Sequence, residues 1–550
     1  MKKHISNITI AGMVLVLAAC ASPAPVAEPA VATEAPAAVE APKKERVLRL
    51  DESPVGEIDP AKATDFADTV LMVNLYDTLT YPKRGTPGVD PLLAVDWKIE
   101  GNSYTFKLRD GVRFHSGNTL TSDDVVFSYN RLMTMGQGFS NLLVDRVDKV
   151  EAIDPLTVRF TLKAAYAPFL AALVKVPIVD SKTVMTHKKD GTFGEYGDYG
   201  AEWLSSHSAG TGAYMVENQN PQSETMMVKF PDHFMGFSTQ APDRVQYRYG
   251  MEAATVRAAL SRGDHEISSL WLPPEVLSAL AKEKGMALYS EGGATGEYVK
   301  LNTKRAPTDD VHCRQALTYA VDYAAALAFL KVNEQFSIGI PANGPIPSGM
   351  LGHDDSPVYA QDMERAKQEL SKCKYKPGDV PLEIAWIAET PAREKNALLM
   401  KQNFEALGFK VNITKVPWAL LTELVSKPET TPNAVEIAVG AVTPDTDSLV
   451  YNMYHSSLAG TWMSAEQLSD AKVDELLEKG RSEPDPAMRK EIYGQLNTRL
   501  KELAPTICLF EATYIYAMRD VVNVPALKDP TKRVFDGGFN LVFREIDVVE

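Results

Sequence analysis

The sequence predicts a mixed α/β protein, because short runs with the two-residue period of strands alternate with segments of helical period. Arg46 to Leu50, Tyr104 to Arg109 and Thr157 to Leu162 each alternate polar and apolar side chains, as half-buried strands do. Asp154-Pro155 provides a turn signal before the third run. Short strands and helices are therefore expected to intermix along the chain.

The clearest helix lies in the second half. Arg393 to Leu407 carries apolar residues at helical spacing and is followed by Gly408, a typical C-terminal breaker. Lys410 to Val416 then alternates as a strand. Helix, glycine and strand in this order predict an αβ unit of a layered domain.

A secretory leader is expected at the N-terminus. Lys2 and Lys3 precede an apolar stretch from Ile8 to Leu17, which is too short to span a bilayer. The small residues that follow end at Cys20, as in the lipobox of bacterial lipoproteins. This resemblance implies cleavage before Cys20 and acylation of that residue, and several acyl chains hold a protein firmly to a membrane. The alternative is an ordinary signal peptide with a chance cysteine.

The segment from Ala21 to Glu45 predicts a tether. It consists almost entirely of Ala, Pro, Val, Glu and Thr, and it has no aromatic residue. Such a composition buries too little surface to offset its conformational entropy, and its prolines favour an extended chain of about 3.1 Å per residue.

The remaining body is long and acidic. About 500 residues are too many for one hydrophobic core, so two or three lobes are expected. The formal charge of −15 would become −17 on loss of Lys2 and Lys3 with the leader, and this charge disfavours nucleic acid as a partner. Cys313, Cys373 and Cys508 allow at most one disulfide, whose pairing the sequence leaves open, as it does the absence of any disulfide.

No known catalytic or metal motif stands out. The nine histidines are scattered, the closest two being His187 and His207, so no zinc pair at helical spacing exists. A Gly-x-Ser-x-Gly elbow, a Walker loop and a Cys-x-x-Cys pair are also absent from the sequence. A binding protein without metal or cofactor is therefore favoured over a secreted hydrolase or an adhesin.

One long block carries a family resemblance. Tyr104 to Ser128 reads YTFKLRDGVRFHSGNTLTSDDVVFS and closely resembles the signature of the family 5 extracellular solute-binding proteins, the peptide and nickel receptors of ABC importers. Within it, Thr121 to Asp124 also has the pattern of a helix N-cap with acids in the first turn. Further matching blocks are Asp90–Trp97, Gly210–Tyr214, Leu301–Lys304 with Arg314–Leu317 and Asp322, and Val473–Leu477.

The resemblance implies a periplasmic-binding-protein-like clamp of the class II type, with two large lobes and an inserted smaller lobe. The blocks place lobe one at 46–85, 206–300 and 515–550, the insert at 86–205, and lobe two at 301–514. Hinges would then fall near Leu301-Asn302 and near Phe510.

The implied function is a lipid-anchored receptor that delivers a solute to ABC permease subunits. The expected ligand is a di- or oligopeptide, and the expected state is an exported monomer that faces the periplasm or the cell exterior. The alternative is the same role for an oligosaccharide, an opine-like compound or a nickel chelate.

Candidate ligand contacts follow from the same resemblance. Dipeptide receptors of the family hold the ligand carboxylate with an arginine after a strand and at the start of a helix, where Arg393 lies here, although a first-turn arginine is often only a surface group. Peptide receptors usually also carry Trp-x-x-Asp after a buried strand to bind the amine. The matching segment, Val439 to Val442, has neither residue. Asp445 and Asp447 are candidates to replace the acid, with turn capping as the alternative.

The loss of that acid weakens the peptide assignment, because a ligand without a free amine would need no carboxylate there. Aromatic side chains are expected to line a solute cleft, with packing in the core as the alternative for each. The candidates are Trp271, Trp418, Tyr454 and Trp462.

Overall fold

A computed structural model of the chain describes residues 45–53, 57–64, 66–354, 360–388, 390, 392–534 and 537–549. Residues 45–550 form one compact unit. Cys20 and the predicted tether lie outside the described residues. Within the described part of the chain, none of the helices has the length and apolar character needed to cross a bilayer.

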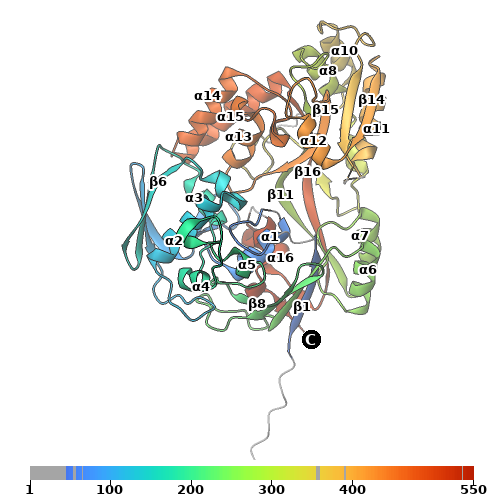
Figure 1. The fold of residues 1–550 in the computed structure, drawn as a ribbon. Helices are drawn as coiled ribbons and strands as arrows, with labels where there is room; N and C mark the ends of the chain where they lie inside the picture. Colours follow the sequence, from blue (N-terminus) through green and yellow to red (C-terminus); the bar gives the residue numbers. More distant parts are fainter. Residues whose placement is uncertain are drawn as a thin grey trace, which may run out of the picture. The chain divides into compact units, whose positions relative to one another are not determined.

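Two long antiparallel strands form the spine of the fold. β11 (Met286–Leu301) pairs with β16 (Thr506–Arg519), and Figure 1 shows them side by side in the centre of the molecule. They belong to a six-stranded sheet with the order β12-β16-β11-β15-β13-β14. The predicted lobe boundaries at 300/301 and 514/515 fall inside these two strands.

The segment predicted as lobe one is built on a four-stranded sheet. Its order is β1-β10-β9-β8, and its first strand, β1 (Val47–Glu52), confirms the strand predicted from Arg46 to Leu50. Ile267 bridges Leu50 of β1 to Met518 of β16 and so links this sheet to the spine. The helix α1 (Phe66–Leu75) is buried almost throughout and contributes to the core below the sheet.

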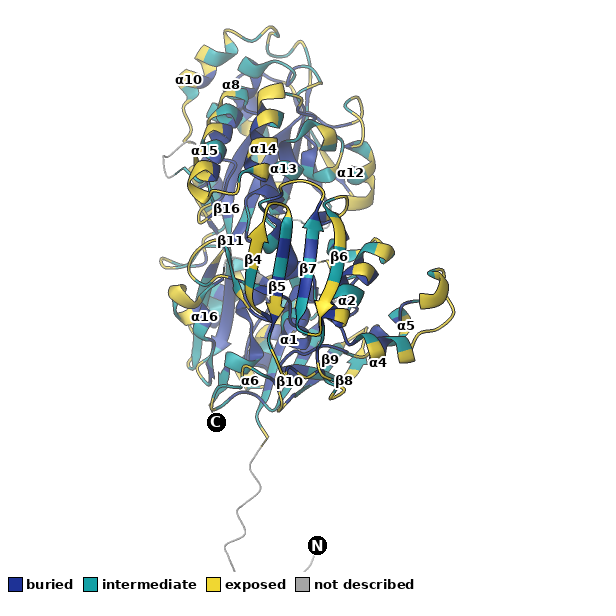
Figure 2. Cartoon of the chain, turned by 90° about the vertical axis from the view of Figure 1, so that its left-hand side faces the viewer, coloured by how far each residue is buried: buried dark blue, intermediate teal, exposed yellow. Residues whose placement is uncertain are grey.

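The predicted insert contains a separate antiparallel sheet with the order β4-β5-β7-β6. β5 (Ser103–Leu108) and β7 (Thr157–Leu162) confirm the two predicted strands, and Figure 2 shows that these middle strands carry the buried side chains. The helix α2 (Ser122–Met135) begins at the predicted N-cap, Thr121, whose side chain and backbone both bond to Asp124. A cluster of aromatic and aliphatic side chains fills the space between sheet and helix.

The predicted αβ unit is also confirmed. β13 (Leu382–Ile387) is followed by α11 (Arg393–Glu405) and by β14 (Val411–Val416), which pairs with β13 in parallel. β15 (Ala434–Gly440) joins this pair to β11. Apolar side chains cover both faces of the sheet, because helices pack on each side of it.

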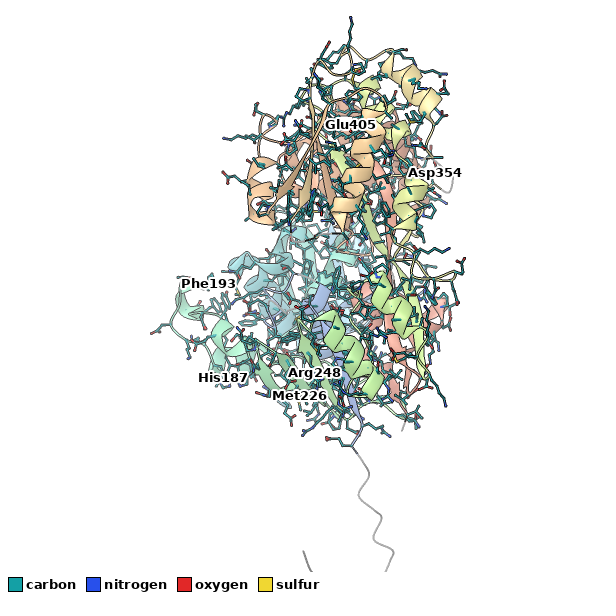
Figure 3. All side chains as sticks on the ribbon, turned by 90° about the vertical axis from the view of Figure 1, so that its right-hand side faces the viewer. His187, Phe193, Met226, Arg248, Asp354 and Glu405 are labelled. Atoms are coloured by element: carbon teal, nitrogen blue, oxygen red, sulfur yellow. A yellow bond between two sulfur atoms is a disulfide. The ribbon has the colours of Figure 1, made fainter. Side chains whose placement is uncertain are left out.

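The other strands are short. They are β2 (Thr80–Pro82), β3 (Val89–Pro91), β4 (Ala94–Glu100), β6 (Val147–Asp154), β8 (Tyr214–Asn220), β9 (Glu224–Lys229), β10 (Arg244–Tyr249), β12 (Gly339–Ile340), β17 (Val522–Asn523) and β18 (Asp547–Val548). Met226 of β9 and Arg248 of β10 lie near each other on the four-stranded sheet (Figure 3).

The other helices surround the sheets. They are α3 (Phe169–Ala172), α4 (Ser181–Thr186), α5 (Ala201–Leu204), α6 (Ala253–Arg262), α7 (Pro274–Leu280), α8 (Val311–Ala320), α9 (Tyr323–Ala328), α10 (Met363–Leu370), α12 (Trp418–Leu424), α13 (Asp447–Tyr454), α14 (Ala471–Ser482), α15 (Pro486–Leu503) and α16 (Pro525–Lys528).

The structure selects one of the cysteine pairings that the sequence left open. Cys313, in α8, forms a disulfide with Cys373, just beyond α10, and their Cα atoms are 5.2 Å apart. Cys508 is a buried thiol in β16. The disulfide therefore fastens α10 to α8 on one side of the αβ unit.

Candidate functional site

A junction of three segments lies where β11 is irregular. The pairing of β11 with β16 shifts between Gly292 and Gly296, and at this point Thr295 is paired with Gly440, the last residue of β15. The backbone N–H of Ala441 donates to the carbonyl of Ala294 at 2.9 Å. We call residues 292–296, 440–442 and 511–514 the seam.

The seam requires close packing around Tyr514. Its hydroxyl lies 2.9 Å from Oγ1 of Thr295, and its ring lies 6.1 Å from that of Phe66 at the start of α1. A Cβ atom on Gly293 would come within 2.5 Å of the Tyr514 ring, and one on Gly440 within 2.6 Å of Thr295 Oγ1. Glycine at these two positions is what allows β15, β11 and β16 to approach so closely.

The seam also reaches the insert. Val442, which stands where peptide receptors of the resembled family carry an acid, packs against the apolar core of the insert. Nearby, the N–H of Ala167 donates to the carbonyl of Arg481 at 2.9 Å and so ties the insert to α14. The side chain at position 442 therefore contacts apolar groups and offers no charge to a ligand.

Arg393 lies at the start of α11, as predicted, but it already has a carboxylate partner. Its Nε and Nη2 donate to the two carboxylate oxygens of Glu297 on β11, at 2.6 and 3.2 Å. Both side chains are about nine-tenths buried. Burial alone would lower the pKa of Arg393, yet the Glu297 carboxylate beside it raises that pKa overall. The guanidinium is thus held charged inside its own lobe.

A second acid, Glu436 of β15, lies next to this pair. One of its oxygens accepts from Asn396 Nδ2 at 2.6 Å, and the other has no hydrogen-bond partner among the described residues. Burial, followed by the charge of Glu297, raises the pKa of Glu436 well above its usual range. Since one guanidinium faces two carboxyl groups, the protonated form of Glu436 is favoured.

The structure brings Asp445 and Asp447 together, each with its own arginine. Asp445 accepts from Arg489 of α15 at 2.8 Å through both oxygens, and Asp447 accepts from Arg481 of α14 at 3.0 and 2.9 Å. These two-point pairs join the start of α13 to the next two helices. Both acids are satisfied inside the protein, so their predicted contact with a ligand stays a prediction.

Trp271 is the most exposed of the aromatic candidates, with 58% of its surface accessible. Its Nε1 donates to Glu52 at the end of β1 at 3.0 Å. Glu52 and its neighbour Asp51 are both buried, and this burial raises the pKa of Glu52 to about 8 and that of Asp51 to about 7. The exposed indole thus bonds to one of two neighbouring buried acids whose pKa values are raised.

The other aromatic candidates lie in the segment predicted as lobe two. Trp418 and Trp462 pack edge to face with ring centroids 5.4 Å apart, and Trp418 is 36% exposed. Tyr454 is fully buried and its hydroxyl bonds to Oγ1 of Thr506 at 3.2 Å, so it belongs to the core.

Comparison with known proteins identifies the family. The model of the bacterial extracellular solute-binding proteins, family 5 (middle region), matches residues 88–461, which is more than half of the chain. The chain belongs to this family. Its members are solute-binding proteins and not enzymes, which agrees with the lack of catalytic motifs in the sequence.

Curated members of the solute-binding family match most of the chain. The probable D,D-dipeptide-binding periplasmic protein of Escherichia coli K12 is 28% identical over 492 residues, which cover 87% of this chain and 91% of the relative. Heme-binding protein A of Haemophilus influenzae is 27% identical, with 79% and 81% covered. Ligands in the family therefore include both peptidic and non-peptidic molecules.

Solved structures confirm the predicted binding-protein fold. A periplasmic binding protein associated with an ABC transporter of Helicobacter pylori, in complex with the peptide STSA, superimposes with a TM-score of 0.74 at 22% identity. The match covers 92% of this chain and 99% of the other.

One group of potential metal ligands occurs in this solute-binding protein, among the residues that the structure describes. It consists of Asp310, Cys313 and Cys373. The two sulfurs are joined in the disulfide, and Asp310 caps the N-terminus of α8 through the N–H groups of His312 and Cys313. A disulfide supplies no thiolate, so this group does not fit a metal ion.

Sequence reasoning missed the partners of the predicted charges: Glu297, Glu436, Arg481 and Arg489. The run Ala434–Gly440, AVEIAVG, places one acid in an otherwise apolar strand, and this was a usable signal for Glu436, since buried strands rarely carry an uncompensated charge. Arg481 and Arg489 lie on amphipathic helices, where charged residues are common. The sequence pattern therefore does not indicate that these two side chains are buried.

Proposed function

We propose that the chain is an extracellular receptor that captures peptides or closely related solutes and delivers them to ABC permease subunits. The observation that carries this proposal is the similarity to the probable D,D-dipeptide-binding periplasmic protein over 87% of the chain. The similarity covers 91% of the relative as well, so it is not confined to a short motif.

The solute would bind at the seam. The spine strands connect the segments predicted as lobe one and lobe two, so a change in their twist near residues 292–296 would open or close the space between them. Trp271 supplies an exposed aromatic surface on the lobe-one side. Among the seam glycines, Gly292 has open space on the side where a Cβ atom would lie, so a ligand backbone could approach it there.

Acylated Cys20 would anchor the receptor to a membrane, and the segment from Ala21 to Glu45 would act as its tether. Confinement near the permease raises the effective concentration of the loaded receptor. Twenty-five extended residues reach up to about 80 Å at 3.1 Å per residue, which is enough for the body to turn toward a permease.

A second candidate is a solute without a free amine, and Val442 favours it. An ammonium group next to this apolar side chain would lose water without gaining a carboxylate, which is unfavourable. An N-acylated peptide, an opine-like compound or another amine-free solute would avoid that loss. The heme-binding relative shows that the family includes a non-peptide binder.

Native mass spectrometry of the full-chain protein, followed by release and identification of small molecules that co-purify, tests both candidates. We expect a peptidic solute in the released fraction. Calorimetric titration with dialanine and with N-acetyl-dialanine then separates the two, because only the amine differs. Tighter binding of the acetylated form would support the second candidate, and the reverse order would support the first.

A further inference from the structure

We propose that a polar cavity between the insert and lobe two binds a carboxylate group through Arg146 and Arg481. The cavity has a volume of about 40 Å³, and it lies between the α3 region of the insert and the helices α13 and α14. Its lining residues are Asn141, Leu142, Arg146, Tyr166, Pro168, Ala172, Thr443, Asp447, Ser448, Asn452 and Arg481. Figure 1 shows α13 and α14 next to α3.

Arg481 is the first reason for this assignment. Its side chain is buried, with only 7% of the residue exposed, and its Nε and Nη2 are taken by Asp447 at 3.0 and 2.9 Å. Its Nη1 is buried without a hydrogen-bond partner among the described residues. A buried guanidinium N–H left without an acceptor is costly, so an acceptor is expected in the cavity that Arg481 lines.

The charge of the cavity is the second reason. Arg481 is neutralised by Asp447, whereas Arg146 has no carboxylate partner among the described residues. The guanidinium carbon of Arg146 lies 5.2 Å from the ring centroid of Tyr166, which carries no charge to neutralise it. One positive charge therefore remains, and it favours an anion over a cation or a neutral group.

The ring of Tyr166 lies close to the guanidinium groups of both arginines. Its ring lies 5.2 Å from the guanidinium carbon of Arg146 and 5.8 Å from that of Arg481. The Ala167–Arg481 backbone bond fixes the same segment of the insert against α14. Because Arg146 belongs to the insert and Arg481 to lobe two, a carboxylate between them would join the two parts of the molecule.

The size and chemistry of the lining match a carboxylate. One water needs roughly 10–15 Å³ of such volume, so this cavity admits a group of a few heavy atoms and no large ring. The amide side chains of Asn141 and Asn452 and the hydroxyl groups of Thr443 and Ser448 also line it. Guanidinium groups bind carboxylates with paired, charge-assisted hydrogen bonds.

Thermal unfolding of the full-chain protein in sodium acetate, compared with sodium chloride at equal ionic strength, tests the proposal. Acetate is expected to raise the melting temperature in a saturable way, because it binds the folded chain alone. Arg146→Gln should weaken acetate binding about tenfold, which corresponds to about 1.4 kcal/mol. Arg481→Lys should also weaken acetate binding. Lysine can still pair with Asp447, but it has no nitrogen in the place of Nη1, which would bind acetate.

Lys98→Gln is the matched control. It removes one positive charge from the same insert, but Lys98 is exposed, pairs with Glu100 at 2.6 Å and does not line the cavity. Its acetate affinity should equal that of the wild type. Superimposable acetate and chloride curves for the wild type would overturn the proposal, as would an unchanged acetate affinity in Arg146→Gln, even if Arg481→Lys fails to fold.

The carboxylate could belong to the captured solute or to a small free acid, and calorimetry distinguishes them. If saturating acetate weakens the binding of dialanine, the cavity holds the carboxylate of the solute. If dialanine binds equally well with and without acetate, the cavity takes a separate small carboxylate. If dialanine does not bind at all, the proposal of a peptide receptor fails. The acetate experiment still decides whether the cavity binds a carboxylate.

Discussion

The Nε atom of Arg393 lies 2.6 Å from Oε1 of Glu297, and both side chains are about nine-tenths buried. The arginine that the family resemblance offers to a ligand carboxylate is thus neutralised by an acid of β11, in the strand that forms half of the spine. Two of its three guanidinium nitrogens are taken by Glu297, and the third, Nη1, lies 3.5 Å from Oγ1 of Thr390. The predicted contact of Arg393 with a ligand carboxylate stays a prediction, and Glu297 would compete with the ligand for this arginine.

Loss of Arg393 should destabilise the protein strongly. Arg393→Met leaves Glu297 buried next to Glu436 without a cation, and breaking a buried pair in this way costs about 3–5 kcal/mol. Urea unfolding monitored by tryptophan fluorescence measures the change. Arg257→Met is the control, because Arg257 pairs with Glu283 at the surface at 3.2 Å, and such a pair is worth about 0–1 kcal/mol. Equal losses in the two variants would contradict a buried role for Arg393.

The contribution of Glu52 to the stability of the fold should fall as the pH rises from about 4.5 to 8. Burial raises the pKa of Glu52 from 4.5 to about 8, so in this window the folded chain holds more protons than the unfolded chain. A raised carboxyl pKa therefore contributes stability below pH 4.5 that is lost as the pH passes 8. Glu52→Gln keeps a neutral acceptor for Trp271 and should flatten the decline.

Melting temperatures between pH 5 and 8.5 provide the measurement for this comparison. The pKa of Asp51 is also raised, to about 7. The Glu52→Gln variant should therefore keep a smaller dependence of the melting temperature on pH. The exposed Glu429 serves as the control, and Glu429→Gln should leave the wild-type slope unchanged. A Glu52→Gln variant with the full wild-type slope would show that Glu52 does not titrate in this range.

The disulfide between Cys313 and Cys373 should stabilise the fold. It closes a loop of 60 residues, for which the loop-entropy relation gives about 4 kcal/mol. The melting temperature of the double variant Cys313→Ser/Cys373→Ser should therefore be lower than that of the wild type. Dithiothreitol should lower the melting temperature of the wild type and leave that of the double variant unchanged.

Alkylation of the mature protein in urea without reductant counts the free thiols. It should modify one thiol, that of Cys508, because acylation of Cys20 blocks the thiol of that residue. A second modified thiol in the body would argue against the pairing.

Cys20→Ser should release the protein from the membrane fraction. The reason is that serine cannot accept a thioether-linked lipid. Fractionation of cells after metabolic labelling with an alkyne fatty acid measures both label and location. Cys508→Ser is the matched control and should stay membrane-bound. A labelled or membrane-bound Cys20→Ser variant would exclude this residue as the anchor.

Individual strands and helix caps were predictable where the alternation of polar and apolar residues, or a bond within a few residues, determines the local structure. β7 begins and ends at the predicted residues, Thr157 and Leu162, because each side chain of that run faces either the core or the other side. The cap at Thr121 was predictable too, since its bonds are made within three residues. These elements depend on neighbours in the chain.

The charge pairs were not predictable, because their partners lie far apart in sequence. Glu297 and Arg393 are 96 residues apart, and Asp447 and Arg481 are 34 apart. A periodic pattern shows that a residue lies on a strand or helix, but it contains no information about which distant side chain faces it. Hence the sequence suggested ligand contacts for Arg393, Asp445 and Asp447, each of which has a protein partner in the structure.

Calorimetric titration of the full-chain protein with di- to pentapeptides and their N-acetylated forms tests the central claim most directly. The account predicts a saturable heat with one site per chain for at least one of these solutes, and recovery of that solute unchanged after the titration. No saturable heat with any of them, or hydrolysis of the peptide by the protein, would contradict a receptor for peptides and related solutes.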